Sequence, residues 1–353
     1  MAKEVFFKNP LEGACYEEIA RTEDAFSLQP SVFHNPLDDD AKVALCDPFG
    51  FIYIEGEEKP YYFMRHALID MYRFGGIVEL GDGPLDTQKT SDVDDFHQKG
   101  MITDTYRKRE TPEGEEFCYG FGTEEPYSKY RLYKDHATFE EGKDILKLDA
   151  EFISDAIVDH QASFGNLPQI FFPAKWQGTY RGKKVTGIGH YAHNYQLMHK
   201  NENILASLGY ISLSLMGYRP DGKLEMAFIA MDQTGTAGAW YKLEGEPLIS
   251  CTEVSMEADW YHLPYVDDGT CVFIDAIFRF GGKTLHFDGK WGSKGMTKEP
   301  RIEKHGQSHI FGTWYEGDTP YDHELSFGFS ENMEAYDYKL EKMGFEVKQW
   351  QRE

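Results

Sequence analysis

Apolar and polar residues alternate with a period of two along much of this 353-residue chain. In the segment 145–152, the apolar residues at 146, 148, 150 and 152 would lie on one face and the charged residues at 147, 149 and 151 on the other. This alternation is typical of a half-buried β-strand. Similar segments, rich in aromatic and β-branched residues, predict strands at 210–216, 224–231, 271–280, 284–291 and 324–329.

Turn residues separate these segments at short intervals. Between two of them, residues 219–223 read Arg-Pro-Asp-Gly-Lys, which predicts a tight turn and therefore a hairpin. Helical patterns are few, and we predict short helices only at 11–26 and 332–343. Short strands at turn spacing, together with 34 glycines, indicate an all-β chain built as a sandwich or barrel.

One short segment recurs along the chain. Arg-Phe-Gly-Gly at 73–76 appears again at 279–282, and each copy is followed at the same spacing by Asp-Gly. Two unrelated hairpins with similar turn residues would explain this repeat, and so would a duplicated β-module. On the second interpretation the chain divides into an N-terminal domain, 1–235, and a C-terminal domain, 236–353.

The charge of the chain excludes several classes of function. It carries 60 Asp and Glu against 36 Lys and Arg, a formal net charge of −24. Nucleic-acid binding and adsorption to anionic lipid both need a basic surface, so we expect neither. No stretch reaches the roughly 20 apolar residues that cross a bilayer, and the N-terminal residues lack the apolar core of a signal peptide. We therefore expect a cytoplasmic protein without membrane insertion.

The densest group of chemically active side chains lies at 186–196. On a strand, His190, Ala192 and Asn194 would share one face, and Tyr191, His193 and Tyr195 the other. Histidine can exchange a proton near neutral pH, and Tyr or Asn can hold a substrate oxygen. The same residues could also be structural, with their polar tips bonded to neighbouring backbone.

We expect neither a metal nor an organic cofactor. His190, His193 and His199 are close in sequence, but the first two point to opposite faces and no nearby carboxylate completes a set. The glycines at 187 and 189 lack the rest of a dinucleotide-binding fingerprint. The five cysteines show no Cys-x-x-Cys spacing, and no nucleophile elbow is present.

A second group combines aromatic residues with carboxylates, at 257–265 and 312–318. Such residues can stack on sugar rings, and a carboxylate pair could hydrolyse a glycosidic bond. They are equally consistent with core aromatics that run into an acidic turn.

The segment from about 132 to 232 resembles the central part of the carotenoid 1,2-hydratase (hydroxyneurosporene synthase-like) family. This family belongs to a two-domain lipocalin-like superfamily that also includes fungal decalin-forming Diels–Alderases. Its motif is Gly-x-Gly-Tyr-x-Asp-His-Asn-Trp-Gly, preceded by a Pro and Trp-Gln/Gly strand and followed by a strand that ends in aspartate. The corresponding residues here are Gly187, Gly189, His190, His193, Asn194 and Tyr195, with 172–178 upstream and Met231-Asp232 downstream.

The resemblance implies two lipocalin-like (calycin) β-barrel or β-sandwich modules around an apolar pocket for isoprenoid-like (terpenoid) or polyketide-like molecules. Four motif positions differ: the tyrosine is His190, the aspartate is Ala192, the tryptophan is another aromatic, Tyr195, and the final glycine is Gln196. Because the aspartate is the natural proton donor for hydrating an alkene, the acid here would be His190, Tyr191 or His193. Residues 161–200 contain no Asp or Glu, so an assisting carboxylate would come from a distant strand.

We therefore expect a cofactor-independent enzyme, a hydratase (lyase) or an isomerase or cyclase, acting on a small hydrophobic substrate. Its chemistry would be hydration or dehydration, isomerisation or cyclisation. The expected acid–base residues are His190 and His193, the hydrogen-bonding partners Tyr191 and Asn194, and the aromatic walls Trp176, Tyr195, Trp240 and Trp260. The alternatives are a carrier of a lipophilic ligand without catalysis, or a carbohydrate-active β-sandwich. The sequence leaves the oligomeric state open.

Overall fold

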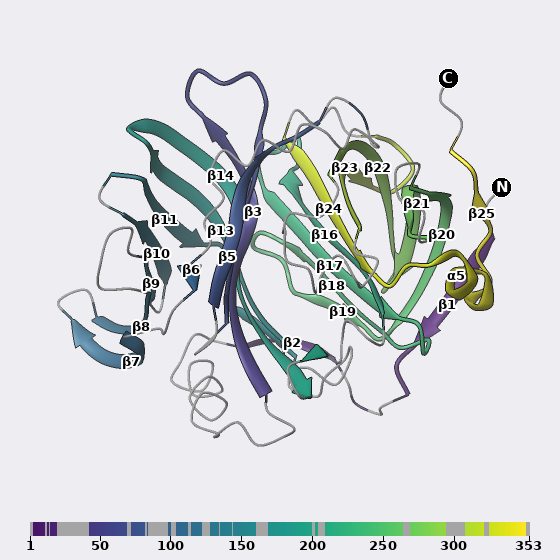
Figure 1. Cartoon of the computed structure of the whole chain (residues 1–353), viewed down its shortest axis with the longest axis horizontal. Coiled ribbons are helices and arrows are strands. Elements are labelled where there is room, and N and C mark those ends of the chain that lie inside the picture. Colours follow the sequence, from purple (N-terminus) through teal and green to yellow (C-terminus); the bar gives the residue numbers. More distant parts are fainter. Residues whose placement is uncertain are drawn as a thin grey trace.

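The computed structural model describes residues 3–10, 13, 15–19, 42–68, 72–81, 83, 98–99, 104–111, 114–121, 128–133, 135–142, 144–159, 169–199, 202–203, 209–263, 269–293, 308–320 and 325–350. These residues form two large β-sheets and one short helix, α5 (Asp337–Met343). Figure 1 shows the N-terminal sheet in blue and teal beside the C-terminal sheet in green and yellow. The all-β prediction with two modules is confirmed.

The N-terminal sheet contains β2 (Tyr16–Ile19), β3 (Lys42–Ile54), β4 (Tyr61–Leu68), β5 (Tyr72–Glu79), β6 (Gln98–Lys99), β7 (Asp104–Thr111), β8 (Gly114–Phe121), β9 (Ser128–Leu132), β10 (His136–Glu141), β11 (Leu146–Phe152), β12 (Ala156–Asp159), β13 (Gln169–Tyr180), β14 (Lys183–His199) and β15 (Glu202–Asn203). Its main order is β6-β5-β4-β3-β14-β13-β11-β10-β9-β8-β7. Alternate residues of β11 are buried, as the sequence pattern predicts.

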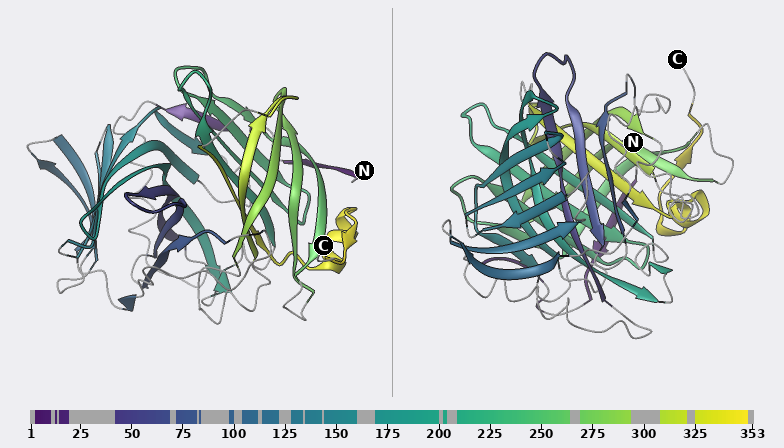
Figure 2. Two further views of the ribbon diagram at one scale, coloured as in Figure 1. Left: turned by 90° about the horizontal axis from the view of Figure 1, so that it is seen from above. Right: turned by 60° about the vertical axis from the view of Figure 1, so that its left-hand side comes forward.

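The C-terminal sheet contains β1 (Glu4–Lys8), β16 (Tyr210–Tyr218), β17 (Leu224–Asp232), β18 (Ala237–Leu243), β19 (Ile249–Cys251), β20 (Glu253–His262), β21 (Cys271–Phe280), β22 (Lys283–Ser293), β23 (Ser308–Glu316), β24 (Ser326–Met333) and β25 (Val347–Lys348). Its order is β1-β20-β21-β22-β23-β24-β16-β17-β18-β19, and β25 pairs with β20. Because β1 pairs with β20, the beginning of the chain is part of the C-terminal sheet (Figure 2).

The sheet changes between β15 and β16, whereas the boundary expected at 235/236 falls in the turn between β17 and β18 of one sheet. The two Arg-Phe-Gly-Gly segments also differ in structure. The first lies inside β5, and the second ends β21 and turns through Gly281 and Gly282, which both have positive φ. Because the two segments differ in structure, their similar sequences are better explained by independent use of the same residues than by duplication of a hairpin.

The turn predicted at 219–223 is confirmed, since the Gly222 N–H donates to the Arg219 carbonyl at 2.8 Å and Gly222 has a φ of 82°. The helix predicted at 332–343 is confirmed only from Asp337, because β24 continues to Met333. The helix predicted at 11–26 is wrong at 16–19, where β2 pairs with β12, and most of its other residues lie outside the described part.

Apolar side chains form three cores, one inside each sheet and one between the two sheets. The core between the sheets joins residues such as Phe49, Phe51 and Phe171 of the N-terminal sheet to Phe228, Trp240 and others of the C-terminal sheet. Strands β16 and β17 are therefore buried along nearly their whole length, because one face lines the C-terminal core and the other faces the N-terminal sheet.

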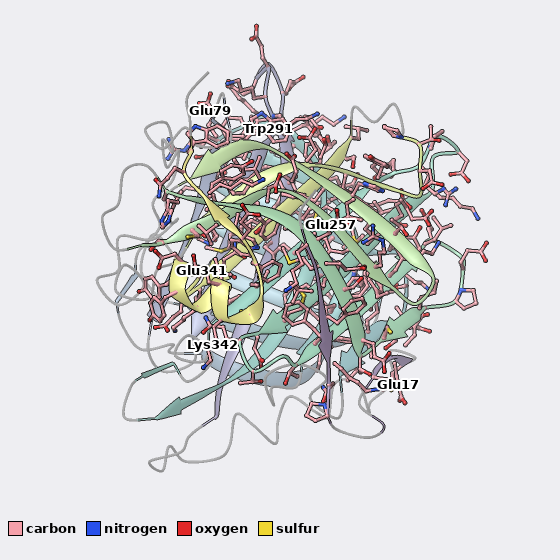
Figure 3. All side chains as sticks on the ribbon, turned by 90° about the vertical axis from the view of Figure 1, so that its right-hand side faces the viewer. Glu17, Glu79, Glu257, Trp291, Glu341 and Lys342 are labelled. Carbon is pink, nitrogen blue, oxygen red and sulfur yellow. The ribbon has the colours of Figure 1, made fainter. Side chains whose placement is uncertain are left out.

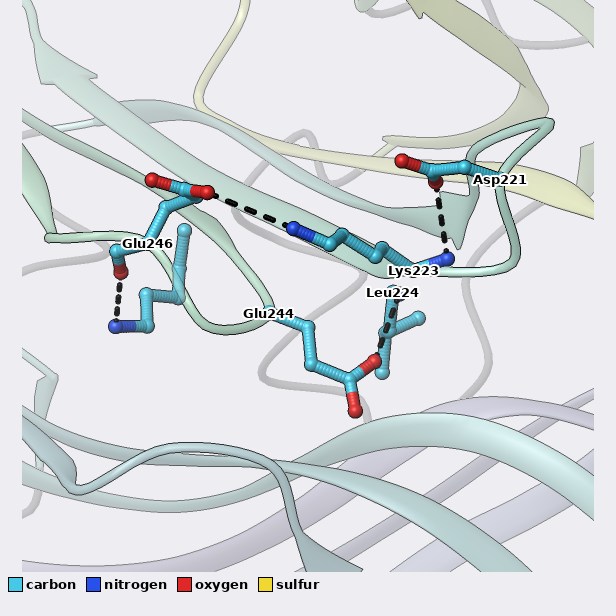
Figure 4. A network of polar contacts seen from close by, with 6 residues as sticks. Asp221, Lys223, Leu224, Glu244 and Glu246 are labelled. Atoms are coloured by element: carbon cyan, nitrogen blue, oxygen red, sulfur yellow. Dashed lines mark hydrogen bonds and ion pairs between the residues drawn. The ribbon is translucent and has the colours of Figure 1, made fainter.

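Ion pairs connect the two sheets around this apolar contact. Lys175 of β13 reaches Glu244 at 3.0 Å, and Lys242 of β18 reaches Glu18 of β2 at 2.7 Å. Figure 4 shows how local contacts hold the acceptor in place: Glu244 also accepts a hydrogen bond from the Leu224 N–H at 3.0 Å. The turn-forming segments of β16–β18 thus supply a polar rim to the contact between the sheets.

Glycine is required at position 189, where β14 runs close to β3 and β13. A Cβ atom there would lie 2.4 Å from the Phe49 carbonyl oxygen and 2.4 Å from the indole ring of Trp176. Because neither neighbour can move aside freely, we expect Gly189→Ala to lower the free energy of unfolding by about 1–3 kcal/mol. Urea denaturation measures this change. Gly83→Ala is the control, since a Cβ atom there meets nothing within 4 Å, and equal stability of the two variants would contradict the packing.

Candidate functional site

His190 lies in the middle of β14, between β3 and β13. Its backbone neighbours in register are Phe49 on β3 and Pro173 on β13. Because side chains alternate along a strand, His190 and Tyr191 point to opposite faces of the sheet. The His190 ring contacts residues of the core between the sheets, whereas Tyr191 belongs to the core of the N-terminal sheet. The structure therefore determines which face of the predicted motif meets the second sheet.

Three aromatic rings surround the imidazole of His190. The ring centroids of Phe49, Phe171 and Trp240 lie 5.3, 5.7 and 5.4 Å from it. Phe49 and Phe171 come from the N-terminal sheet and Trp240 comes from β18 of the C-terminal sheet. We call these four residues the His190 cage. It is completed only when the two sheets are together.

The imidazole of His190 is completely buried, and neither ring nitrogen has a hydrogen-bond partner among the described residues. Burial lowers the pKa of His190 to about 3, so the ring is neutral at physiological pH. A neutral imidazole offers one N–H donor and one acceptor nitrogen. Leaving such groups unpaired in an apolar interior costs about 1–3 kcal/mol each. The cage therefore contains hydrogen-bonding capacity that no described residue uses.

The other expected aromatic walls are distributed over different cores. Trp176 packs in the N-terminal core, edge-on to Phe63 and Phe139, and it covers Gly189 from the face opposite His190. Trp260 is buried in the C-terminal core beside Phe273. Of the expected site residues with described side chains, His190 and Trp240 meet in the cage, whereas Tyr191 and Trp176 lie in the N-terminal core, where both contact Phe139.

His193, Asn194 and Tyr195 continue β14 beyond the cage. The backbone of His193 is in register with Ile170 and Cys46, and that of Asn194 with Gln169 and Leu45. The side chains of these three residues lie outside the described part of the chain, so their roles remain predictions.

A second histidine, His309, lies on the face of the C-terminal sheet that meets the N-terminal sheet. Its Nε2 donates to Oε1 of Glu331 at 3.3 Å, and its ring stacks on Phe329 with 5.3 Å between centroids. Sequence reasoning missed this pair because the partners are 22 residues apart on different strands. The available clue was that His309 and Phe311 share a face of an alternating strand.

A cleft of about 670 Å³ lies on the outer face of the C-terminal sheet, where Figure 3 labels Glu257. It joins the two predicted aromatic and acidic segments, since Glu257, Asp259 and Tyr315 all line it. Trp314 also lines the cleft, but Trp260 and Trp314 are only 0% and 2% exposed, so neither ring presents a broad face on which a sugar could stack. Partial burial, and then the charge of Asp288 directly opposite, raise the pKa of Asp275 in this cleft.

Among the described residues, no three His, Cys, Asp or Glu side chains are grouped as metal ligands. No helix in the described part of the chain is long and apolar enough to span a membrane.

No family model and no curated protein sequence matches this chain. Solved structures do match it at low sequence identity. CghA, solved with Sch210972, aligns at a TM-score of 0.52 and 9% identity over 94% of this chain and 99% of that chain. A protein assigned as AttH from Nitrosomonas europaea gives 0.49 and 11% over 84% and 93%, and kievitone hydratase from Nectria haematococca gives 0.45 and 11% over 82% and 88%. The chain therefore shares the fold of CghA, and this agrees with the lipocalin-like fold that the resemblance of its central segment predicts.

Proposed function

We propose that this chain is an enzyme that binds a small hydrophobic molecule between its two sheets and promotes proton transfer on it without a cofactor. Hydration or dehydration, isomerisation and cyclisation are the reactions that this chemistry covers. The observation that carries the proposal is the His190 cage, in which a completely buried imidazole has two unpaired nitrogens.

The cage favours a particular kind of substrate. Its walls are aromatic, so a largely apolar molecule is stabilised there by burial of its surface. The neutral ring of His190 can donate a hydrogen bond to a hydroxyl, carbonyl or ether oxygen of that molecule. In an apolar interior such a donor strongly stabilises negative charge that develops on the oxygen.

The low pKa also limits what His190 does. A ring with a pKa of about 3 is not a source of protons at neutral pH and is a weak base. We therefore assign His190 the role of a neutral hydrogen-bonding group that orients the substrate and polarises it. Because the ring is completely buried, the substrate reaches it only when a side chain of the cage moves. CghA, which shares the fold, has been solved with Sch210972, and this supports a small-molecule site in such a scaffold.

Incorporation of solvent deuterium tests the proposal. The protein is incubated in D2O with Sch210972 and with a panel of isoprenoid- and polyketide-like alkenes, and products are followed by mass spectrometry. We expect wild type to convert or label at least one compound and His190→Phe to do so about 100-fold more slowly, because the substrate loses its hydrogen bond. His286→Gln, which changes the outer cleft, is the control and should behave as wild type.

The same experiment separates the alternatives. Compounds that are bound but recovered unchanged and unlabelled would indicate a carrier and would contradict the enzyme proposal. Glycan binding that is lost in Asp288→Asn and kept in His190→Phe would indicate a carbohydrate site in the outer cleft instead.

A further inference from the structure

We infer that His309 and Glu331 supply the proton in the site between the sheets, with His309 as the proton-transfer group and Glu331 as the residue that positions it. This inference rests on the proposed function, since it assigns the acid–base step of the same site. It places that step on the C-terminal sheet, outside the sequence motif that contains His190.

The geometry of the pair is fixed by the sheet. His309 on β23 and Glu331 on β24 are directly opposite each other in register, and Nε2 of the ring lies 3.3 Å from Oε1 of the carboxylate. On the other side of β24, the Ser212 hydroxyl of β16 donates to the backbone carbonyl of Glu331 at 3.1 Å. Three adjacent strands therefore fix the backbone of Glu331, from which its carboxylate reaches the ring.

The burial of the two side chains differs in a useful way. His309 is 2% exposed and Glu331 is 19% exposed. The ring is therefore inside the apolar contact between the sheets, while the carboxylate keeps access to water. A proton can enter through Glu331 and reach the imidazole without crossing the aromatic core.

Aromatic rings connect this pair to the His190 cage. His309 stacks on Phe329, and the ring centroids of Phe329 and Phe49 are 6.4 Å apart. Phe49 is itself a wall of the cage. His190 and His309 therefore lie on the same apolar interface, separated by two phenylalanine rings. An elongated hydrophobic molecule lying along these rings would meet one histidine near each end.

The two histidines then have different tasks. A positive charge on His309 is compensated by Glu331, whereas His190 has no counter-ion among its cage residues and stays neutral. The protonated ring donates a proton from Nδ1, the nitrogen that faces away from Glu331. The π-electron pair of a substrate double bond takes up this proton and forms a new C–H bond. The ring recovers a proton either from the water that adds or from the carbon that loses one, so it ends as it began.

The first part of the test needs no substrate. Spectra of protein labelled with 15N-histidine report the environment of each ring nitrogen, and His309→Gln assigns the His309 signals. We expect the Nε2 signal of His309 to move in Glu331→Gln, because the ring loses its contact with the carboxylate, while the His190 signals stay unchanged. The pair His262 and Asp337, with 3.7 Å between Nε2 and Oδ2, is a more exposed internal reference. His309 signals that are the same in wild type and in Glu331→Gln would overturn the inference.

The second part uses any compound that wild type converts or labels in D2O. We expect His309→Gln to slow labelling about 100-fold while binding, measured by native mass spectrometry, changes less than threefold. Glu331→Gln should shift the pH profile of labelling, and Glu331→Asp should restore part of it. His262→Gln is the matched control and should label as wild type.

The outcomes separate this inference from the proposal on which it rests. No labelling of any compound by wild type would overturn both. Labelling that is lost in His190→Phe and kept in His309→Gln would overturn the His309 assignment alone. If His309→Gln fails to fold, Glu331→Gln carries the test, because its partly exposed carboxylate is replaced by a group of the same shape.

Discussion

Replacing Trp240 by alanine is expected to lower the free energy of unfolding by about 3–5 kcal/mol, as for other fully buried large aromatics. Trp240 is completely buried between the sheets and packs edge-on against both Phe171 and His190. Its removal would leave a cavity that the strands on either side cannot close. Urea denaturation followed by circular dichroism measures the change.

Trp240→Phe is the matched control for this prediction, because it keeps an aromatic ring in the contact. It should cost clearly less than the alanine variant. A loss below about 1 kcal/mol for Trp240→Ala would mean that the two sheets are not packed together through this ring.

Acid should destabilise the protein through His190. The folded protein holds the ring neutral, with a pKa of about 3, whereas a histidine in the unfolded chain has a pKa of about 6.5. Between these values the unfolded chain binds the additional proton, so stability falls as the pH is lowered from about 6.5 towards 3. Each pH unit in this window costs up to about 1.4 kcal/mol.

His190→Phe removes this contribution. Compared by urea denaturation at pH 7 and pH 4.5, wild type is expected to lose about 2–3 kcal/mol more than the variant. At pH 7 the variant should be at least as stable as wild type, because it no longer buries two unpaired nitrogens. An identical pH dependence in both proteins would contradict the buried, neutral state of His190.

Alternation along the sequence located five of the eleven described strands of the C-terminal sheet, namely β16, β17, β21, β22 and β24. The strand predicted at 271–280 coincides with β21, because its apolar side chains face one packed core. Alternation could not show that β16 and β17 are buried on both faces, since that burial depends on the second sheet. The helix predicted at 11–26 was wrong at β2 because pairing with β12 overrides local helical preference there.

The candidate site was only partly accessible from the sequence. The motif contained His190 and separated its two possible faces, but the face that meets Trp240 is decided by how the sheets pack. Trp176 was grouped with His190 because it is adjacent in the resemblance, and it lies across the sheet from it. From the sequence, any carboxylate that assists the motif histidines would come from a distant strand. The carboxylate of our inference, Glu331, acts instead on His309, and their contact depends on cross-strand register.

The most direct test of the account is the 15N-histidine spectrum recorded while a converted compound, or Sch210972, is added. His190 reports the contact between the sheets, and His286 reports the outer cleft that it lines. We expect the nitrogen signals of His190 to shift as its ring gains hydrogen bonds, while those of His286 stay unchanged. Binding that shifts His286 and leaves His190 untouched would contradict it.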